Sequence, residues 1–360
     1  MKIRICYNSA LLLVAILLIA VPGYGFGTPK QVTRILYGPH AEQIGVSWAG
    51  GHGDGDNPYD LGPRGFAVDD RGDFYLGDYV SGAIKRFSPK GQLLAVTEGL
   101  IINLQSFWVS PTGDIYARNE DRSSEVIRFD ARGHRVWART FREIVPQDEL
   151  AHLEQQYGEK FPMGFSTEIT AGPHGTIMIK TFGQLPTGRA GQEIGILISD
   201  AGQFIETRPY FGLKSGEIWW QYNIDEAGFT DGVAPPVTVK LYTEDGTVKQ
   251  TISLDVRADT TRYQHMTKYS SVLLIPDQRN GTFLITLAPR KDPLKVTPTT
   301  LVKFDYVVDR YNADGKFVER FSFPDGPFVA TFRSNIAIGQ DGKFYYMRYD
   351  SKGFDAMVCQ

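Results

Sequence analysis

Short apolar and aromatic runs recur along this chain, and polar turns that end in glycine separate them. Phe66–Val68 and Phe74–Leu76, for example, flank a turn that ends at Gly72. Runs of this length with alternating side chains predict β-strands. A glycine at the end of a tight turn accepts the positive φ angle that a short hairpin requires. The pattern therefore predicts a protein made of many β-hairpins.

The hairpins repeat with a constant period. Gly72 and Gly113 are 41 residues apart, and Gly91 and Gly133 are 42 residues apart. Two hairpins per period give a four-stranded unit, and a period of about 40 residues is typical of the blade of a β-propeller. A WD-repeat assignment is disfavoured because no Gly-His and Trp-Asp pairs mark the repeats. Further copies of the turn glycines stand at Gly175, Gly202, Gly246, Gly281, Gly315 and Gly342.

The first repeat carries a recognisable motif. It comprises Gly51-His52-Gly53-Asp54-Gly55-Asp56, then Pro63-Arg64-Gly65-Phe66-Ala67-Val68-Asp69, then Gly72, Tyr75, Asp78, Ile84 and Phe87. This segment resembles an NHL repeat, and the resemblance is specific over roughly residues 51–133 and degenerate elsewhere. It implies an all-β fold, a six-bladed β-propeller with four-stranded blades.

The copies of the repeat predict how the ring closes. Five units have both hairpins or traces of both, and a sixth unit, which begins at Ser334, lacks its last strand. The N-terminal stretch Ile35–Val46 resembles the missing part. We therefore expect strands from the N- and C-terminal ends to share the last blade, which hides edges that would otherwise invite aggregation.

The spacing of the turn glycines predicts one elaborated face. In a blade with strands A to D, the A–B and C–D turns lie on one face, and the B–C loops and D-to-A links lie on the other. Gly175 to Gly202 and Gly281 to Gly315 are longer than the first two copies, which adds residues to the B–C loops. The D-to-A links are also lengthened. Because repeat proteins bind with the face that carries insertions, we expect the ligand there.

One insertion predicts a short helix near residues 146–158. Leu150, Leu153 and Tyr157 fall on one face of such a helix, acidic residues suit its start and Gly158 suits its end. Two interpretations are open: the helix covers the central cavity as a lid, or it lies on the surface with its apolar side chains against a blade. The amphipathic pattern favours the second.

The N-terminus follows the export pattern. Lys2 and Arg4 precede the apolar run Ala10–Val21, which is too short to span a bilayer and is followed by a breaker and small residues. We expect a cleaved signal peptide over residues 1–27, a single mature domain over 28–360, and a secreted or periplasmic location. No integral membrane segment is expected after cleavage. The mature chain would keep one cysteine, Cys359, which we expect to be a packed strand residue.

The charge of the chain is too small to indicate a strongly anionic partner. The net charge of −3 becomes −5 when the two basic residues of the leader are removed. This balance does not indicate binding to nucleic acid or to an anionic membrane. The expected partner is a protein, peptide or glycan.

Polar residues at the starts of the inner strands are the candidate site. They should ring the central channel, where arginine and glutamate could bind a carboxylated or sugar-like ligand. The alternative is that these side chains pair with one another and with water in the channel. The candidates are Arg64, Gln105, Glu168, Tyr269, Arg333 and Asn335, with His52 and His265 on the insertion-bearing face.

Metal chemistry has little support in the sequence. The acidic loop Gly51–Asp60 lacks the ligand spacing of an EF-hand, and no histidines stand at ligand spacing. We expect no cofactor, with calcium or zinc as the alternative. The acidic turn Asp69–Gly72 is interpreted as turn chemistry on the plain face.

Two functions remain open. The sequence favours a binding or scaffold protein without enzymatic activity, because no catalytic constellation emerges. The alternative is a metal-dependent lactonase-like hydrolase or a peptide lyase with its site in the central channel, since the resemblance extends to propellers of these kinds. Such an enzyme needs converging ligands, for which Glu168 and Asn335 are the obvious starting pair.

Overall fold

The protein folds into small antiparallel sheets and little helix. In the computed structural model, the described strands form six four-stranded sheets, and every strand pair within them is antiparallel. The structure describes residues 29–45, 63–99, 101, 107–119, 125–157, 168–184, 190–210, 213–215, 218–224, 237–243, 245–254, 272–276, 282–289, 304–312, 314, 316–323, 336–349 and 352–359.

The first three sheets follow the chain order. Sheet I comprises β2 (Pro63–Val68), β3 (Phe74–Asp78), β4 (Ala83–Phe87) and β5 (Leu93–Val96). Sheet II comprises β6 (Phe107–Val109), β7 (Ile115–Asn119), β8 (Glu125–Phe129) and β9 (Arg135–Thr140). Sheet III comprises β10 (Glu168–Ala171), β11 (Ile177–Gln184), β12 (Ala190–Ile198) and β13 (Phe204–Pro209), with the short 3-10 turn Pro173–Gly175 between β10 and β11.

The next two sheets repeat this order, and the last one does not. Sheet IV comprises β14 (Leu213–Ser215), β15 (Ile218–Ile224), β16 (Val237–Tyr242) and β17 (Val248–Leu254). Sheet V comprises β18 (Val272–Pro276), β19 (Thr282–Pro289), β20 (Phe304–Tyr311) and β21 (Phe317–Phe323). Sheet VI comprises β22 (Ile336–Ile338), β23 (Phe344–Tyr349), β24 (Gly353–Cys359) and, as its fourth strand, β1 (Lys30–Leu36).

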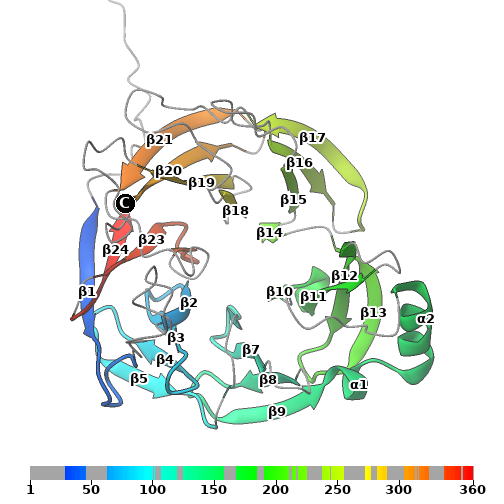
Figure 1. Ribbon diagram of the computed structural model, residues 1–360, viewed down its shortest axis with the longest axis horizontal. Helices are drawn as coiled ribbons and strands as arrows, with labels where there is room; N and C mark the ends of the chain where they lie inside the picture. The colour runs from blue at the N-terminus through cyan, green and yellow to red at the C-terminus, as the bar shows by residue number, and fades with distance from the viewer. Residues whose placement is uncertain are drawn as a thin grey trace, which may run out of the picture.

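The sheets stand in a ring. Figure 1 shows the first strand of each sheet near the centre and the last strand at the rim. Apolar side chains of neighbouring sheets pack together between them; for example, Ile84 of sheet I lies in one cluster with Val109 and Ile127 of sheet II. Radial sheets that share their apolar faces in this way define a β-propeller, so the predicted propeller fold is confirmed.

The N-terminal strand completes the last sheet, as expected. β1 pairs with β24 in antiparallel register from Lys30 opposite Val358 to Leu36 opposite Gly353. The strand begins earlier than the predicted stretch, Ile35–Val46. Cys359 is fully buried at the end of β24, which confirms its role as a packed residue.

The turns between the A and B strands and between the C and D strands are short and alike. Gly72 and Gly113 have φ angles of 79° and 88°, and the N–H of Gly72 donates to the carbonyl of Asp69. A side chain other than glycine would be strained at these angles. The predicted role is therefore confirmed for the turn glycines that the structure describes, while Gly281 and Gly315 lie outside the described residues.

The expansion of sheet III differs from the prediction. The extra residues between Gly175 and Gly202 were expected to form a B–C loop, but most of them lengthen the strands: β11 has 8 residues and β12 has 9, against 5 for β7 and 5 for β8. The ladder continues because Phe182 pairs with Glu193 and Gln184 pairs with Ala190. The loop expectation is wrong to that extent, since continued pairing satisfies backbone groups that a loop would leave to water.

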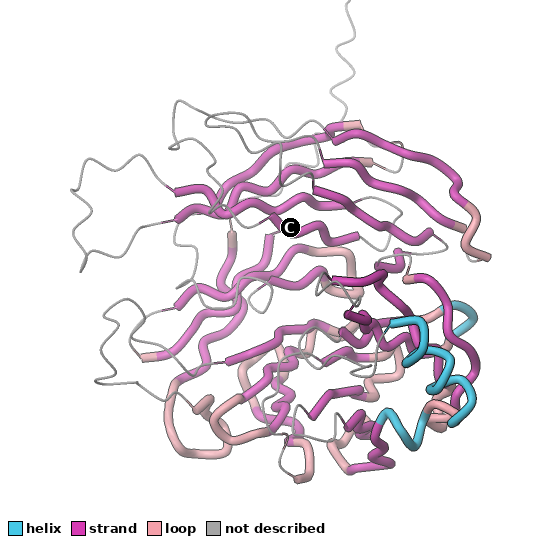
Figure 2. The backbone as a smooth tube through the Cα atoms, turned by 45° about the vertical axis from the view of Figure 1, so that its right-hand side comes forward, coloured by secondary structure: helices cyan, strands magenta, loops and turns pink. Residues whose placement is uncertain are grey.

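The predicted helix is present at the rim. α2 (Gln147–Tyr157) follows the short helix α1 (Phe141–Ile144). In Figure 1, α2 lies outside β13 and α1 lies at the rim where β9 ends, and Figure 2 shows both helices at one edge of the molecule. Leu150 and Leu153 are buried in the core cluster of sheets II and III, and Thr207 of β13 donates a hydrogen bond to Glu149. The helix is therefore docked on a blade, and the interpretation as a lid over the centre is wrong. Among the described residues, no helix has the length and apolarity to cross a membrane.

Candidate functional site

The structure describes part of the predicted site. The side chain of Glu168 is described at the start of β10, and Arg64 is described as a backbone position in β2. The acidic loop Gly51–Asp60 lies outside the described residues. The same holds for Gln105, Tyr269, Arg333, Asn335, His52 and His265.

Glu168 belongs to a charged cluster on sheet III. Its register partner on β11 is Lys180, and the Lys180 Nζ lies 3.8 Å from Glu168 Oε2 and 2.8 Å from Glu193 Oε1. The same ammonium lies 4.7 Å from the centre of the Tyr210 ring, a cation–π distance. Strand A begins at the end of the sheet opposite the A–B turn, so this cluster lies toward the face expected to carry insertions. We call Glu168, Lys180 and Glu193 the sheet III cluster.

The sheet III cluster is partly open to solvent. The Lys180 side chain is 15% exposed, while Glu168 and Glu193 are 32% and 43% exposed. Glu168 thus pairs with Lys180, which was not among the candidate residues. The pairing leaves carboxylate oxygens accessible, and these can accept charge-assisted hydrogen bonds from a ligand. Within the described ranges, no group of three His, Cys, Asp or Glu side chains could hold a metal ion.

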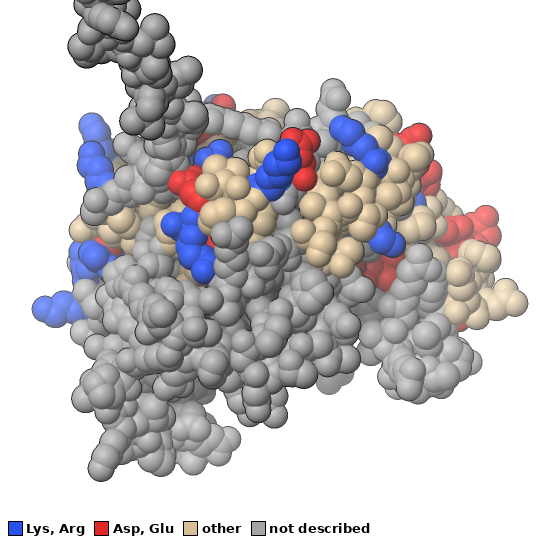
Figure 3. Space-filling view, turned by 90° about the horizontal axis from the view of Figure 1, so that it is seen from above, with Lys and Arg blue, Asp and Glu red and all other residues tan. Residues whose placement is uncertain are grey.

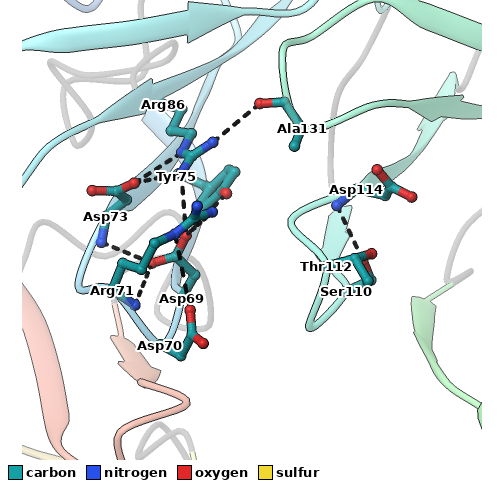
Figure 4. Close-up of polar contacts among 10 residues, drawn as sticks. All are labelled: Asp69, Asp70, Arg71, Asp73, Tyr75, Arg86, Ser110, Thr112, Asp114 and Ala131. Carbon is teal, nitrogen blue, oxygen red and sulfur yellow. Dashed lines mark hydrogen bonds and ion pairs between the residues drawn. The ribbon is translucent and has the colours of Figure 1, made fainter.

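A second polar network lies on the plain face. Asp69, which is 2% exposed, accepts hydrogen bonds from the N–H groups of Arg71 and Asp73 and from the Tyr75 hydroxyl (Figure 4). The first two bonds shape the A–B turn, so the interpretation as turn chemistry is confirmed. The bond from Tyr75 extends the network into the interior between sheets.

Arg86 of β4 connects this turn to the next sheet. Its Nε lies 3.0 Å from Asp73 Oδ2, and its Nη1 lies 3.1 Å from the carbonyl oxygen of Ala131 in the C–D turn of sheet II (Figure 4). The guanidinium carbon lies 5.4 Å from the centre of the Tyr75 ring. The side chain is 11% exposed. Arg86 therefore joins two neighbouring blades through a nearly buried guanidinium.

Sheets II and III are joined in the same way. Arg128 Nη2 lies 2.7 Å from Asp114 of its own A–B turn, and Arg128 Nη1 lies 3.1 Å from the Asp200 carbonyl of the next sheet. The Tyr116 hydroxyl donates to the Asp200 carboxylate. We call the Arg86 and Arg128 networks the arginine staples.

Sequence reasoning treated these turns as local and missed the staples. A signal was present, because Arg86 and Arg128 are 42 residues apart and each precedes a buried phenylalanine, Phe87 or Phe129. Nothing in a single repeat indicates that the arginine reaches the following one. The contacts join residues far apart in the chain: Arg86 and Ala131 are 45 positions apart, and Arg128 and Asp200 are 72 positions apart.

Burial controls the protonation of the network tyrosines. Desolvation raises the pKa of Tyr75 well above its usual value, and the adjacent Asp69 raises it further, while Arg86 opposes the shift. Burial and Asp200 raise the pKa of Tyr116 in the same way. Burial also raises the pKa of the Cys359 thiol to about 12, so this thiol stays protonated at neutral pH and is a poor nucleophile.

Comparisons with known proteins find similar solved structures only. No protein-family profile matches the chain, and no curated protein matches it. Among solved structures, it is similar to a member of the DUF4221 family from Bacteroides vulgatus, with 12% identity, 92% of this chain and 97% of that chain covered, and a TM-score of 0.46. It is also similar to Kuenenia stuttgartiensis hydrazine synthase (12% identity, 82% and 76% covered, TM-score 0.43) and to Staphylococcus aureus virginiamycin B lyase (11% identity, 84% and 96% covered, TM-score 0.37).

Proposed function

We propose that this chain is an exported, six-bladed, NHL-like β-propeller that works as a binding or scaffold protein. It is made with a signal peptide over residues 1–27, and the mature domain over 28–360 acts in the periplasm or outside the cell. It recognises a protein, peptide or glycan through the face that carries the B–C loops and the D-to-A links, and it has no enzymatic role.

The two faces of the ring differ in the length of the connections between strands, and this difference supports the proposal. On the plain face, the connections between strands A and B and between strands C and D are five residues long almost throughout, as in 69–73, 88–92, 110–114, 130–134 and 199–203. On the opposite face, the connections run from 3 residues (210–212) to 27 residues (141–167). Variation in length concentrates where a scaffold presents its ligand-binding segments, because the core does not constrain them.

The small net charge of the chain, −3, fits a ligand of low net charge. Figure 3 views the ring from its rim, where basic and acidic side chains of the described residues lie among uncharged ones. A partner of this kind is held by hydrogen bonds and by stacking at a few positions. The sheet III cluster supplies such positions, because the Lys180 ammonium lies within 4 Å of a carboxylate oxygen of Glu168 and of Glu193 across three strands.

The test is a screen of mature protein on glycan and peptide arrays, followed by affinity measurements with face-specific variants. Glu168→Gln with Lys180→Met alters the insertion-bearing face, and Arg71→Glu with Lys90→Glu alters exposed residues of the plain face. We expect the first pair to weaken binding at least tenfold and the second pair to leave it within about twofold. Circular dichroism controls for folding. If the plain-face pair abolished binding, the assignment of the face would be rejected. Catalytic turnover of an array compound would reject the binding role.

A further inference from the structure

Lys85 occupies a buried position where its counterparts are apolar. It lies on β4 opposite Leu76 of β3, and its side chain is 6% exposed. The register places Ile127 of β8 and Ile196 of β12 at the same position of the next two sheets. Both isoleucines are buried in apolar clusters. A blade of this fold therefore packs well without a charge at this position, and the lysine of sheet I requires another explanation.

The charge of Lys85 is matched by a fully buried carboxylate. Lys85 Nζ lies 2.8 Å from Asp78 Oδ2, and Asp78 is 0% exposed. The Asp78 carboxylate also accepts hydrogen bonds from the N–H groups of Ser81 and Gly45, at 3.1 and 3.0 Å. Burying such a pair carries a large desolvation cost, which the attraction between the two charges offsets only together with further hydrogen bonds.

Two further partners of this pair come from the N-terminal part of the chain. Lys85 Nζ donates to the carbonyl oxygen of Gln43, and the N–H of Gly45 donates to Asp78. Gln43 and Gly45 belong to the segment 37–45, which directly follows the closing strand β1. The ion pair of sheet I therefore holds the chain that completes sheet VI.

The segment 37–45 is itself fastened to β1. The N–H of Ile44 donates to the carbonyl of Leu36, the last residue of β1, and the N–H of Gly38 donates to the carbonyl of Ile44. Ile44 is fully buried in the cluster shared by sheets I and VI. A side chain on Gly45 would come within 2.7 Å of Val80, so the segment lies close against sheet I. Segment 37–45 therefore connects β1 to Asp78 and Lys85 by hydrogen bonds.

We propose that the Lys85–Asp78 pair is a latch that keeps the N-terminal strand in its own ring. β1 is an outermost strand, with one paired edge along β24, and such strands open at lower free energy than inner ones. The latch attaches the end of β1 to the neighbouring blade, so the strand leaves the sheet only after the hydrogen bonds between segment 37–45 and the buried pair have broken. This role is independent of the ligand and goes beyond the proposed binding function.

Hydrogen–deuterium exchange of the full mature protein tests the latch. The informative variant is Asp78→Asn with Lys85→Ile, because it copies Asn119 and Ile127, the residues at the equivalent positions of sheet II. Sheet I then carries, at these two positions, the side chains that sheet II already accommodates. We expect peptides from β1 to exchange at least about tenfold faster than in the parent protein, with β7 and β8 unchanged. The matched control is Asp309→Asn, which breaks the Asp309–Arg320 pair within sheet V and should leave β1 protected.

Two results would overturn the proposal. Unchanged exchange of β1 in the double variant would show that the pair does not hold the strand. Faster exchange of all sheets by the same factor would show that the pair only stabilises the whole ring. Selective exposure of β1, with sheet I still protected, supports the latch.

Discussion

Neighbouring blades of this propeller contact each other near the plain face in two ways, and we call each such contact a seam. At one register position, the second residue of strand B faces a residue of strand C, and this pair points toward the next blade. Polar pairs fill the position in sheets I and II, and an apolar pair fills it in sheet III. The pairs are Tyr75 with Arg86, Tyr116 with Arg128, and Met178 with Leu197.

The comparison shows that one backbone position supports two chemistries. Arg86 and Arg128 reach backbone carbonyls of the following sheet, whereas Met178 and Leu197 pack against Tyr210 and against Tyr242 of sheet IV. A guanidinium seam depends on geometry, because each donor needs its acceptor. An apolar seam depends on filled volume and tolerates reshaping.

The largest effect is expected when a staple loses its charge. Arg86→Met removes the partner of Asp73 and Asp69 and leaves carboxylates in a nearly buried site. We expect the free energy of unfolding, measured by denaturant titration, to fall by about 3–5 kcal/mol. Arg71→Met is the control, because Arg71 is 58% exposed beside the same Asp69 and should cost less than about 1 kcal/mol. Equal losses for both variants would contradict the staple.

A smaller loss is expected at the apolar seam. Met178 is 1% exposed, so Met178→Ala creates a cavity against Leu197 and Tyr242 and should cost about 2–4 kcal/mol in the same titration. Met178→Leu keeps the volume and should cost less than about 1.5 kcal/mol. If leucine were as damaging as alanine, the seam would depend on the shape of methionine and not on its volume.

The smallest effect distinguishes the seams by pH. The pKa of Tyr75 is raised in the folded protein, so folding favours its protonated form. The contribution of Tyr75 to stability is therefore complete below the unfolded pKa of about 10 and decreases above it by up to about 1.4 kcal/mol per pH unit. Tyr75→Phe should flatten the fall of stability between pH 9.5 and 11, and Met178→Leu should leave it unchanged. An identical slope in parent and Tyr75→Phe would show that this tyrosine titrates normally.

The fold could be predicted because the sequence repeats. The period set by Gly72 and Gly113 indicated four-stranded units, and the surplus half-repeat at the N-terminus indicated the closing strand, now found at Lys30–Leu36. The amphipathic run around Leu150 and Leu153 located the helix. These features are local, because turn conformation and side-chain alternation act within a few residues.

Less of the candidate site could be predicted from the sequence. Glu168 was identified from its place at the start of an inner strand, but its partners Lys180 and Glu193 were not. Lys180 is recognisable only from the register of β10 with β11, and Glu193 follows from a strand that was expected to be a loop. The pairing of long strands decides these contacts, and alternation alone leaves the register open.

The sequence by itself determined the strands, their turns, the helix and the need for a strand from the other end of the chain, because each depends on neighbouring residues. Only the tertiary structure decided that Arg86 crosses to the next blade, that Lys85 and Asp78 hold the segment after β1, and that the helix lies on the rim. These contacts join residues far apart in the chain, and ring closure brings them together. A buried charge finds its partner through that geometry and not through its neighbours in sequence.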